Sequence, residues 1–241
     1  MICFAQSICA NKIANNKPDP FPIIVQNGLS FYDLNKNEKL DLYEDYRLSI
    51  SERTQDLLKK LSIDEESNLL FGIGMHGFDT KTFTFLVNAD LGRVPGAAGG
   101  TFEIKRLGIK SVIVVDGPAG LRINPKRNNS KNTFFATAFP VGAALASTWN
   151  TNLIEAVGKA IGSEVREYGV DVLLGPGMNI HRNPLCGRNF EYYSEDPLLS
   201  GKIADAMVNG IQSIGVGTSI KHYLANNQGR NLSIPTLVNE P

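Results

Sequence analysis

The sequence contains little cysteine, histidine or tryptophan. Its 241 residues include three cysteines, three histidines and one tryptophan. Three cysteines give neither the even count of a disulfide framework nor the paired spacing of a zinc finger. The histidines, His76, His181 and His222, lie far apart and show no regular spacing of ligands. These shortages argue against a disulfide-stapled scaffold and against a zinc protein.

An excess of charge and a long apolar run are also missing. The chain carries 24 lysines and arginines against 24 aspartates and glutamates. Balanced charge gives no reason to expect nucleic acid or an anionic membrane as a partner. No apolar run reaches the ~18 residues of a membrane-spanning helix. We therefore expect neither nucleic acid nor a membrane as a partner, and the length suffices for one domain with a sizeable core.

The first ten residues, Met1 to Ala10, are apolar but few, and they lack a basic start. A secretory signal peptide has a basic start and then a longer apolar region. The stretch corresponds at most to the end of such a signal. The sequence leaves two locations open: secreted or periplasmic if this stretch belongs to a signal peptide, and cytoplasmic otherwise.

Changes in composition divide the chain into four predicted segments. Residues 1–30 are predicted to form an irregular N-terminal arm with three prolines between positions 18 and 22. Residues 31–108 are predicted to form a lead-in with two helices and a loop, and Ser62 and Glu65 have the spacing of a capping box for the second helix. Residues 109–228 are predicted to form an α/β domain, and residues 229–241 a divergent tail.

Buried strands and amphipathic helices alternate in the α/β domain. The predicted strands are 112–116, 143–146, 170–174 and 218–220, and the predicted helices are 151–168 and 197–215. Short apolar runs of this kind are typical of a parallel sheet that is buried on both faces. Asp196-Pro197 should begin the second helix, because aspartate caps free N–H groups and proline fits the first helical position. Right-handed crossovers then place the carboxyl ends of the strands at one edge.

Charged side chains collect at that edge of the predicted sheet. Asp116 ends one strand, Lys221-His222 follows another, and the polar loop 174–197 with Arg188 follows a third. A carboxylate accepts hydrogen bonds from two neighbouring hydroxyls, while lysine and arginine donate, so the set suits a polyol ligand. A network of ion pairs without a ligand would also use these residues. The contribution of three separate strand ends favours the ligand site.

The lead-in contains a loop with the spacing of a calcium-binding EF-hand. The candidate ligands are Asp33, Asn35, Asn37, Asp41 and Glu44. The sixth position is Glu38, where an EF-hand has the glycine that makes its sharp turn. The alternative is a turn rich in aspartate and asparagine that precedes a helix. Calcium is the one metal that the sequence leaves open.

A glycine-rich stretch, Gly72-Ile-Gly74-Met-His-Gly77, formally matches a dinucleotide-binding fingerprint. That fingerprint needs a strand before it and a helix after it. Here a predicted helix precedes it and no helix follows. The hypothesis of a dinucleotide-binding oxidoreductase therefore depends on these glycines alone and is the least favoured one.

Four motifs follow one another along the chain: Asp116–Arg122, Ala138–Pro140, Asn183–Pro197 and Lys221–Gln228. In this order they resemble the N-terminal barrel of glycoside hydrolase family three, the β-glucosidase family. The resemblance covers about residues 31–228, and four ordered motifs are far more specific than one. It implies an α/β fold: an incomplete (β/α)8 TIM-like barrel, about half of the barrel, after an N-terminal helical lead-in.

The resemblance implies a glycosidase, a retaining β-glucosidase that removes terminal non-reducing β-D-glucosyl residues. In such enzymes the aspartate of the first motif holds two hydroxyls of the glycone, and here it is Asp116. Arg122 and Arg188 line the same subsite. Lys221 and His222 donate hydrogen bonds to glycone hydroxyls. No cofactor is implied.

The partner implied is a small carbohydrate. Residues 225–228 lack the histidine-rich stretch of the family members that cleave N-acetylglucosaminides, which favours a β-glucoside or a β-xyloside. Cys186 stands where many members have tryptophan.

The resemblance stops after Gln228. In the family the nucleophilic aspartate and the acid/base glutamate come from later segments, which places both beyond residue 241. We therefore expect that this chain alone does not hydrolyse glycosides, and that it self-associates or pairs with a missing C-terminal half. Two alternatives stay open: a non-catalytic or vestigial sugar-binding fragment, and a half completed by another chain.

Overall fold

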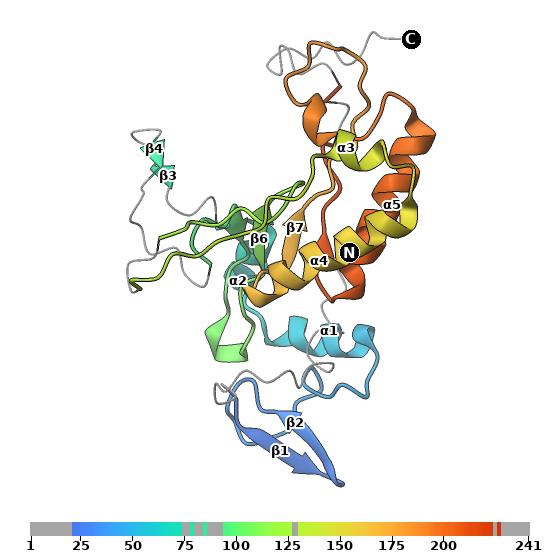
Figure 1. Cartoon of the computed structure of the whole chain (residues 1–241). Helices are drawn as coiled ribbons and strands as arrows, with labels where there is room; N and C mark the ends of the chain where they lie inside the picture. The colour runs from blue at the N-terminus through green and yellow to red at the C-terminus, as the bar shows by residue number, and fades with distance from the viewer. Residues whose placement is uncertain are drawn as a thin grey trace. The chain divides into compact units, whose positions relative to one another are not determined.

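The computed structural model describes residues 21–73, 78–79, 84–85, 94–126, 130–223 and 226–227 (Figure 1). Most of the predicted N-terminal arm, most of the glycine-rich stretch and the predicted tail lie outside these residues. Two compact units are distinguished, Met1–Gly72 with Thr101–Ser111 (unit 1) and Ile73–Gly100 with Val112–Pro241 (unit 2). No helix in the described ranges is long and apolar enough to cross a membrane.

Unit 1 begins with a β-hairpin. Strands β1 (Ile23–Gln26) and β2 (Leu29–Tyr32) pair in antiparallel register. Asn27 and Gly28 connect them with φ values of 52° and 75°, which is the left-handed pair that a tight hairpin turn needs. The prediction of an irregular arm up to residue 30 is therefore wrong from residue 23 onward. The signal was an Asn-Gly pair between two apolar runs.

Two helices follow in unit 1, as the sequence predicts. They are α1 (Ile50–Lys60) and α2 (Ile63–Leu70), and each begins with a complete capping box. Ser49 pairs with Glu52, and Ser62 pairs with Glu65, so each box supplies two hydrogen bonds to free backbone N–H groups. Helix α2 ends at residue 70, so a helix and not a strand precedes the glycine-rich stretch. The strand that a dinucleotide-binding fingerprint requires before its glycines is therefore replaced by a helix.

The predicted calcium loop is closed by its own hydrogen bonds. The carboxylate of Glu44 accepts from the backbone N–H groups of Leu34 at 2.7 Å and Asp41 at 3.0 Å. Asp33 accepts from the backbone of Glu38, which has a left-handed φ of 64° at the position where an EF-hand has glycine. The loop thus makes its sharp turn with glutamate in that place.

Replacing Glu44 by Gln is expected to destabilise unit 1 by about 1–3 kcal/mol. The side chain of Glu44 is 5% exposed, and both of its oxygens accept from backbone N–H groups. An amide would set its NH2 group against one of those donors and leave a buried N–H without an acceptor. Urea denaturation measures the difference, and Glu38→Gln, at an exposed side chain, is the control that should change little.

Calcium binding by this loop stays a prediction. The carboxylate of Asp41 pairs with the ammonium of Lys60 at 2.9 Å, so a lysine already supplies positive charge to one candidate ligand. Calorimetric titration of the chain with calcium should show one site, and Glu44→Gln should remove it. No heat in the wild-type chain would leave only the hydrogen-bonded turn.

Unit 2 contains a four-stranded sheet in the order β5-β6-β7-β8. Strands β6 (Ile113–Asp116), β7 (Val172–Leu174) and β8 (Gly217–Thr218) are parallel, while β5 (Gly99–Gly100) pairs antiparallel with β6. Helix α4 (Thr151–Glu167) connects β6 to β7, and α5 (Pro197–Ser213) connects β7 to β8. The structure therefore confirms the α/β class and the parallel β–α–β connections. Two further short strands, β3 (Phe78–Asp79) and β4 (Thr84–Phe85), pair antiparallel.

One predicted strand is a helix. Residues 143–146 lie in the short helix α3 (Gly142–Ala146), where Leu145 and Ala146 are buried. A short apolar run cannot be assigned to a buried strand or a buried helix from periodicity, and an Ala-Leu-Ala sequence has high helix propensity. The remaining boundaries differ by one or two residues, which is the usual uncertainty at helix and strand ends.

Helices α4 and α5 pack closely against each other (Figure 1). Ile154, Ile161 and Val165 on α4 and Ile203, Met207 and Ile211 on α5 are all buried. Asp196 caps α5 by accepting from the backbone N–H of Leu198 at 2.8 Å, with Pro197 in the first turn, as predicted. Glycines at the crossing let the two backbones approach, since an added Cβ at Gly210 would lie 2.3 Å from a carbonyl oxygen of α4.

Candidate functional site

The carboxyl ends of β6 and β8 bring two predicted site residues together. Asp116 is the last residue of β6, and Lys221 follows β8 in a parallel bridge with Gly177. The ammonium of Lys221 lies 2.5 Å from the Asp116 carboxylate. The lysine side chain is 15% exposed and the aspartate side chain 37% exposed, so the pair is partly accessible. The carboxylate is thus half-buried, and the ammonium that pairs with it is mostly covered.

Hydrogen bonds join the start of the loop after β7 to the segment that holds Lys221. The backbone of Lys221 donates to Pro176 at 3.1 Å and accepts from Met178 at 2.9 Å. The amide oxygen of Asn227 accepts from the backbone of Ile180 at 3.1 Å. These bonds position the polar loop next to Lys221. The Gly175–Pro176 and Lys221–His222 peptide bonds are both cis.

Arg188 is held by an acidic partner within the same loop. Its guanidinium pairs with the carboxylate of Glu191, which is 7% exposed at the end of the short 3-10 helix η2 (Asn189–Glu191). Helix α3 lies against η2, and an added Cβ at Gly142 would lie 2.6 Å from the carbonyl oxygen of Glu191. Burial acts to lower the pKa of Arg188, but the hydrogen bond and charge of Glu191, with smaller contributions from Tyr192 and Asp116, raise that pKa above its ordinary value.

His222 lies in a cluster of polar side chains. Its Nδ1 is 3.1 Å from the amide oxygen of Asn179 and 3.0 Å from the hydroxyl of Tyr192. The ring of Tyr192 is fully buried and lies edge-on to the imidazole at 5.8 Å. Asn226 donates to the same tyrosine hydroxyl at 3.1 Å. The imidazole is thus fixed through its Nδ1 side.

The pKa of His222 is expected to fall below its ordinary value of 6.5. Burial is the main cause, and the positive charges of Arg188 and Lys221 add to it, while Glu191 and Asp116 act in the opposite direction. Because the folded-state pKa is below the unfolded value, protonation opposes folding, and the ring's contribution to stability is lost as the pH falls through the folded pKa. Titration of the histidine resonances by NMR measures this pKa, and a value above 6.5 would contradict the burial argument.

Arg122 lies near Asp116 through its backbone. Its N–H donates to the carbonyl of Asp116 at 3.0 Å and closes a turn that passes through Gly117 and Gly120. An added Cβ at Gly117 would lie 1.8 Å from the carbonyl oxygen of Gly120, so only glycine fits this turn. Arg122 itself is exposed. The structure thus brings Asp116, Arg188, Lys221 and His222 into one electrostatic cluster and places Arg122 at its edge through the turn.

The predicted set of binding residues does not include the residues that hold the cluster in place. They are Asn179, Glu191, Tyr192 and Asn226, each of them buried. The run of polar residues around position 191 was visible, but no spacing rule connects positions 179 and 222. Cys186 is 5% exposed and therefore buried.

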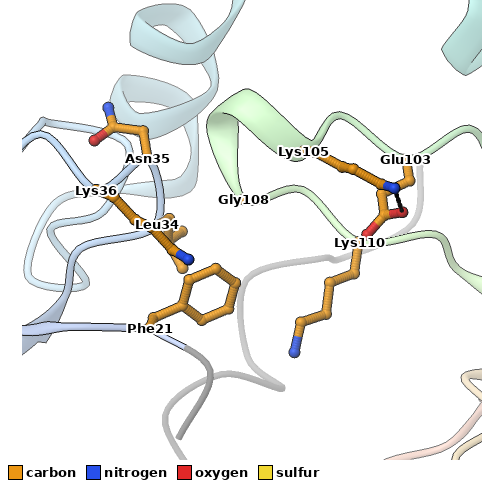
Figure 2. Close-up of a pocket in the computed structure, with 8 residues that line it drawn as sticks. All are labelled: Phe21, Leu34, Asn35, Lys36, Glu103, Lys105, Gly108 and Lys110. Carbon is orange, nitrogen blue, oxygen red and sulfur yellow. Dashed lines mark ion pairs between the residues drawn. The ribbon is translucent and has the colours of Figure 1, made fainter.

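A hollow of about 320 Å³ lies in unit 1 and is lined by none of the predicted sugar-site residues (Figure 2). It is lined by Phe21, Leu34, Asn35, Lys36, Glu103, Lys105, Gly108 and Lys110. The ammonium of Lys110 lies 5.1 Å from the centre of the Phe21 ring, and the other two lysines are likewise exposed side chains. Within the described part of the chain, which includes the predicted calcium loop, no three or more His, Cys, Asp or Glu side chains are grouped so that they could hold a metal ion, so calcium binding would require that loop to rearrange.

Comparison with known proteins gives one family. The family model described as "Glycosyl hydrolase family 3 N terminal domain" matches residues 103–236. Thermostable beta-glucosidase B of Acetivibrio thermocellus is 48% identical over 146 residues, 58% of this chain and 19% of the relative. An exo-alpha-(1->6)-L-arabinopyranosidase of Bifidobacterium longum is 40% identical over 183 residues, 74% of this chain and 21% of the relative.

A solved structure of a β-glucosidase is also similar to this chain. Beta-glucosidase 3B from Thermotoga neapolitana, determined in complex with alpha-D-glucose, matches with a TM-score of 0.68 and 56% sequence identity. The match covers 73% of this chain and 24% of the Thermotoga chain. The chain thus spans about a fifth to a quarter of the length of the relatives it matches. The matched residues include all four predicted motifs, and the chain belongs to glycosyl hydrolase family 3 through that family's N-terminal domain.

Proposed function

We propose that this chain supplies the glycone-binding part of a β-glucosidase active site, which holds the terminal β-D-glucosyl residue of a small glycoside. The observation that carries the proposal is the preformed Asp116–Lys221 pair at two strand ends, with His222 and Arg188 within electrostatic range. Polar groups that converge at the carboxyl ends of parallel strands are typical of ligand sites in α/β folds. Relatives named beta-glucosidase, and a similar structure that contains glucose, support the same assignment.

Each charged group of the cluster has a distinct task in this proposal. The Asp116 carboxylate accepts from two neighbouring hydroxyls, while the Lys221 ammonium pairs with that carboxylate and donates to a third oxygen. Arg188, held by Glu191, donates from the opposite loop. Arg122 reaches the same subsite from the turn after Asp116. Hydrogen bonds to charged groups contribute about 1.5–3 kcal/mol each, so a few of them suffice to orient a sugar.

Both acidic residues of the cluster are engaged in ion pairs. A retaining glycosidase needs two carboxyl groups about 5–5.5 Å apart that are free to act as nucleophile and acid/base. Asp116 pairs with Lys221, and Glu191 pairs with Arg188. We infer that both catalytic carboxyl groups of a complete site come from other parts of the protein. In the same proposal the three parallel strands belong to a (β/α)8 barrel that continues at β8, the last strand in the described sheet order.

The test is calorimetric titration of the chain with glucose, xylose, L-arabinose and N-acetylglucosamine. Binding of glucose or xylose, without binding of N-acetylglucosamine, is the expected result. L-Arabinose is included because one relative is named an arabinopyranosidase. A chain that is folded by circular dichroism but binds none of the sugars would refute the proposal. Preference for L-arabinose over glucose would change the proposed substrate class from β-glucosides to arabinopyranosides.

A further inference from the structure

The backbone of His222 determines how the side chain of Asn179 is oriented. The N–H of His222 donates to the Asn179 amide oxygen at 2.8 Å. A backbone N–H can only donate, so the oxygen and not the NH2 group of the amide must face it. Rotating the amide by half a turn would set two donors against each other in a buried place, since Asn179 is 8% exposed.

The Asn179 oxygen in turn determines the proton on the imidazole. It lies 3.1 Å from Nδ1, and an amide oxygen can only accept. Nδ1 must therefore carry the hydrogen. If it were unprotonated, its lone pair would point at a lone pair of the Asn179 oxygen, and the two would repel each other. The Tyr192 hydroxyl, 3.0 Å away, accepts from the same N–H in this tautomer, whereas it would donate to Nδ1 in the other one, so the Asn179 oxygen decides between them.

We propose that Asn179 and Tyr192 hold neutral His222 as the Nδ1–H tautomer, so that Nε2 accepts a hydrogen bond from a ligand hydroxyl. Identification of that hydroxyl as a sugar hydroxyl rests on the proposed function. The family resemblance assigns His222 a donating role, and this geometry reverses it. The lowered pKa of His222 agrees with a neutral ring, which has one donor and one acceptor nitrogen.

The consequence is a site that presents a donor and an acceptor side by side. The ammonium of Lys221 can only donate, and Nε2 of His222 can only accept. A sugar hydroxyl can satisfy either group, whereas fluorine or an ether oxygen at the same carbon cannot donate to Nε2. The pair therefore selects a free hydroxyl at one position of the glycone. Asn179 and Tyr192 act as positioning residues, because they work through the imidazole.

The tautomer is tested without any sugar. Correlation of ring protons with ring nitrogens by ¹⁵N NMR distinguishes a protonated from an unprotonated Nδ1, and the chain has only three histidines to assign. At a pH above the His222 pKa, we expect a protonated Nδ1 and an unprotonated Nε2. Asn179→Asp should keep this pattern because a carboxylate also accepts, whereas Asn179→Leu, which removes the acceptor, should shift the population toward Nε2–H. A protonated Nε2 in the wild-type chain would overturn the proposal, whatever the variants do.

The accepting role is tested with glucose analogues in which one hydroxyl is replaced by fluorine. We expect one of the 2-, 3-, 4- and 6-deoxyfluoro sugars to bind about threefold to tenfold more weakly than glucose, the range of one net hydrogen bond. His222→Leu should remove that difference for the same analogue. If the tautomer is found but every analogue binds like glucose, Nε2 does not accept from the sugar. If glucose itself does not bind, the sugar part falls with the proposed function, while the tautomer result stands.

Discussion

Replacing Asp116 by Asn is expected to weaken glucose binding about a hundredfold. The carboxylate is proposed to accept from two hydroxyls, and losing about 1.5 kcal/mol at each sums to about 3 kcal/mol, or two decades of affinity. The amide keeps one acceptor but turns an NH2 group toward the other hydroxyl and leaves the Lys221 ammonium without its carboxylate. Calorimetric titration of both chains with glucose measures the change.

Folding should be largely unaffected by this substitution, because the Asp116 side chain is 37% exposed and its ion pair is partly screened by water. Asp205→Asn is the matched control, since Asp205 lies exposed on helix α5 and does not belong to the cluster. The control should bind glucose like the wild-type chain. Equal affinity in Asp116→Asn and Asp205→Asn would remove Asp116 from the sugar site.

Replacing Gly210 by Ala should lower the free energy of unfolding by about 2–3 kcal/mol. The added Cβ would lie 2.3 Å from the carbonyl oxygen of Glu155 and 3.0 Å from the Cα of Gly158, both backbone atoms of helix α4. Backbone cannot rotate away as a side chain can, so α4 and α5 must separate and lose packing around the buried Met207. Urea denaturation followed by circular dichroism measures the loss.

Gly201 provides a control in the same helix. An added Cβ there meets no atom of the described residues within 4 Å. Gly201→Ala should therefore stabilise the chain by up to about 1 kcal/mol, because alanine has the higher helix propensity. Opposite signs for the two substitutions would separate the packing effect from the propensity effect. Stabilisation by both would mean that the α4–α5 crossing is looser than the structure has it.

Local features of this chain were accessible from sequence because their causes are local. The capping boxes of α1 and α2 and the Asp196-Pro197 start of α5 depend on residues within one turn of helix. The strand that ends at Asp116 is a continuous apolar run. The hairpin at Asn27-Gly28 was equally local, and its signal was present but not used. The four ordered motifs identified the family for the same reason, since each is a short contiguous stretch.

The contacts that make the candidate site depend on distance in space. Asp116 and Lys221 are 105 positions apart, and their pairing follows from the register of β6, β7 and β8. The orientation of Asn179 depends on a backbone N–H 43 positions away, which no spacing rule encodes. The residues of helix α3 form a helix and not the predicted strand; a buried apolar run permits both conformations, and packing against η2 accompanies the helical one. Sequence periodicity and caps thus set the local elements, whereas the partners of the charged groups and the tautomer of His222 arise only when those elements pack, because hydrogen bonds between distant residues have no local signature.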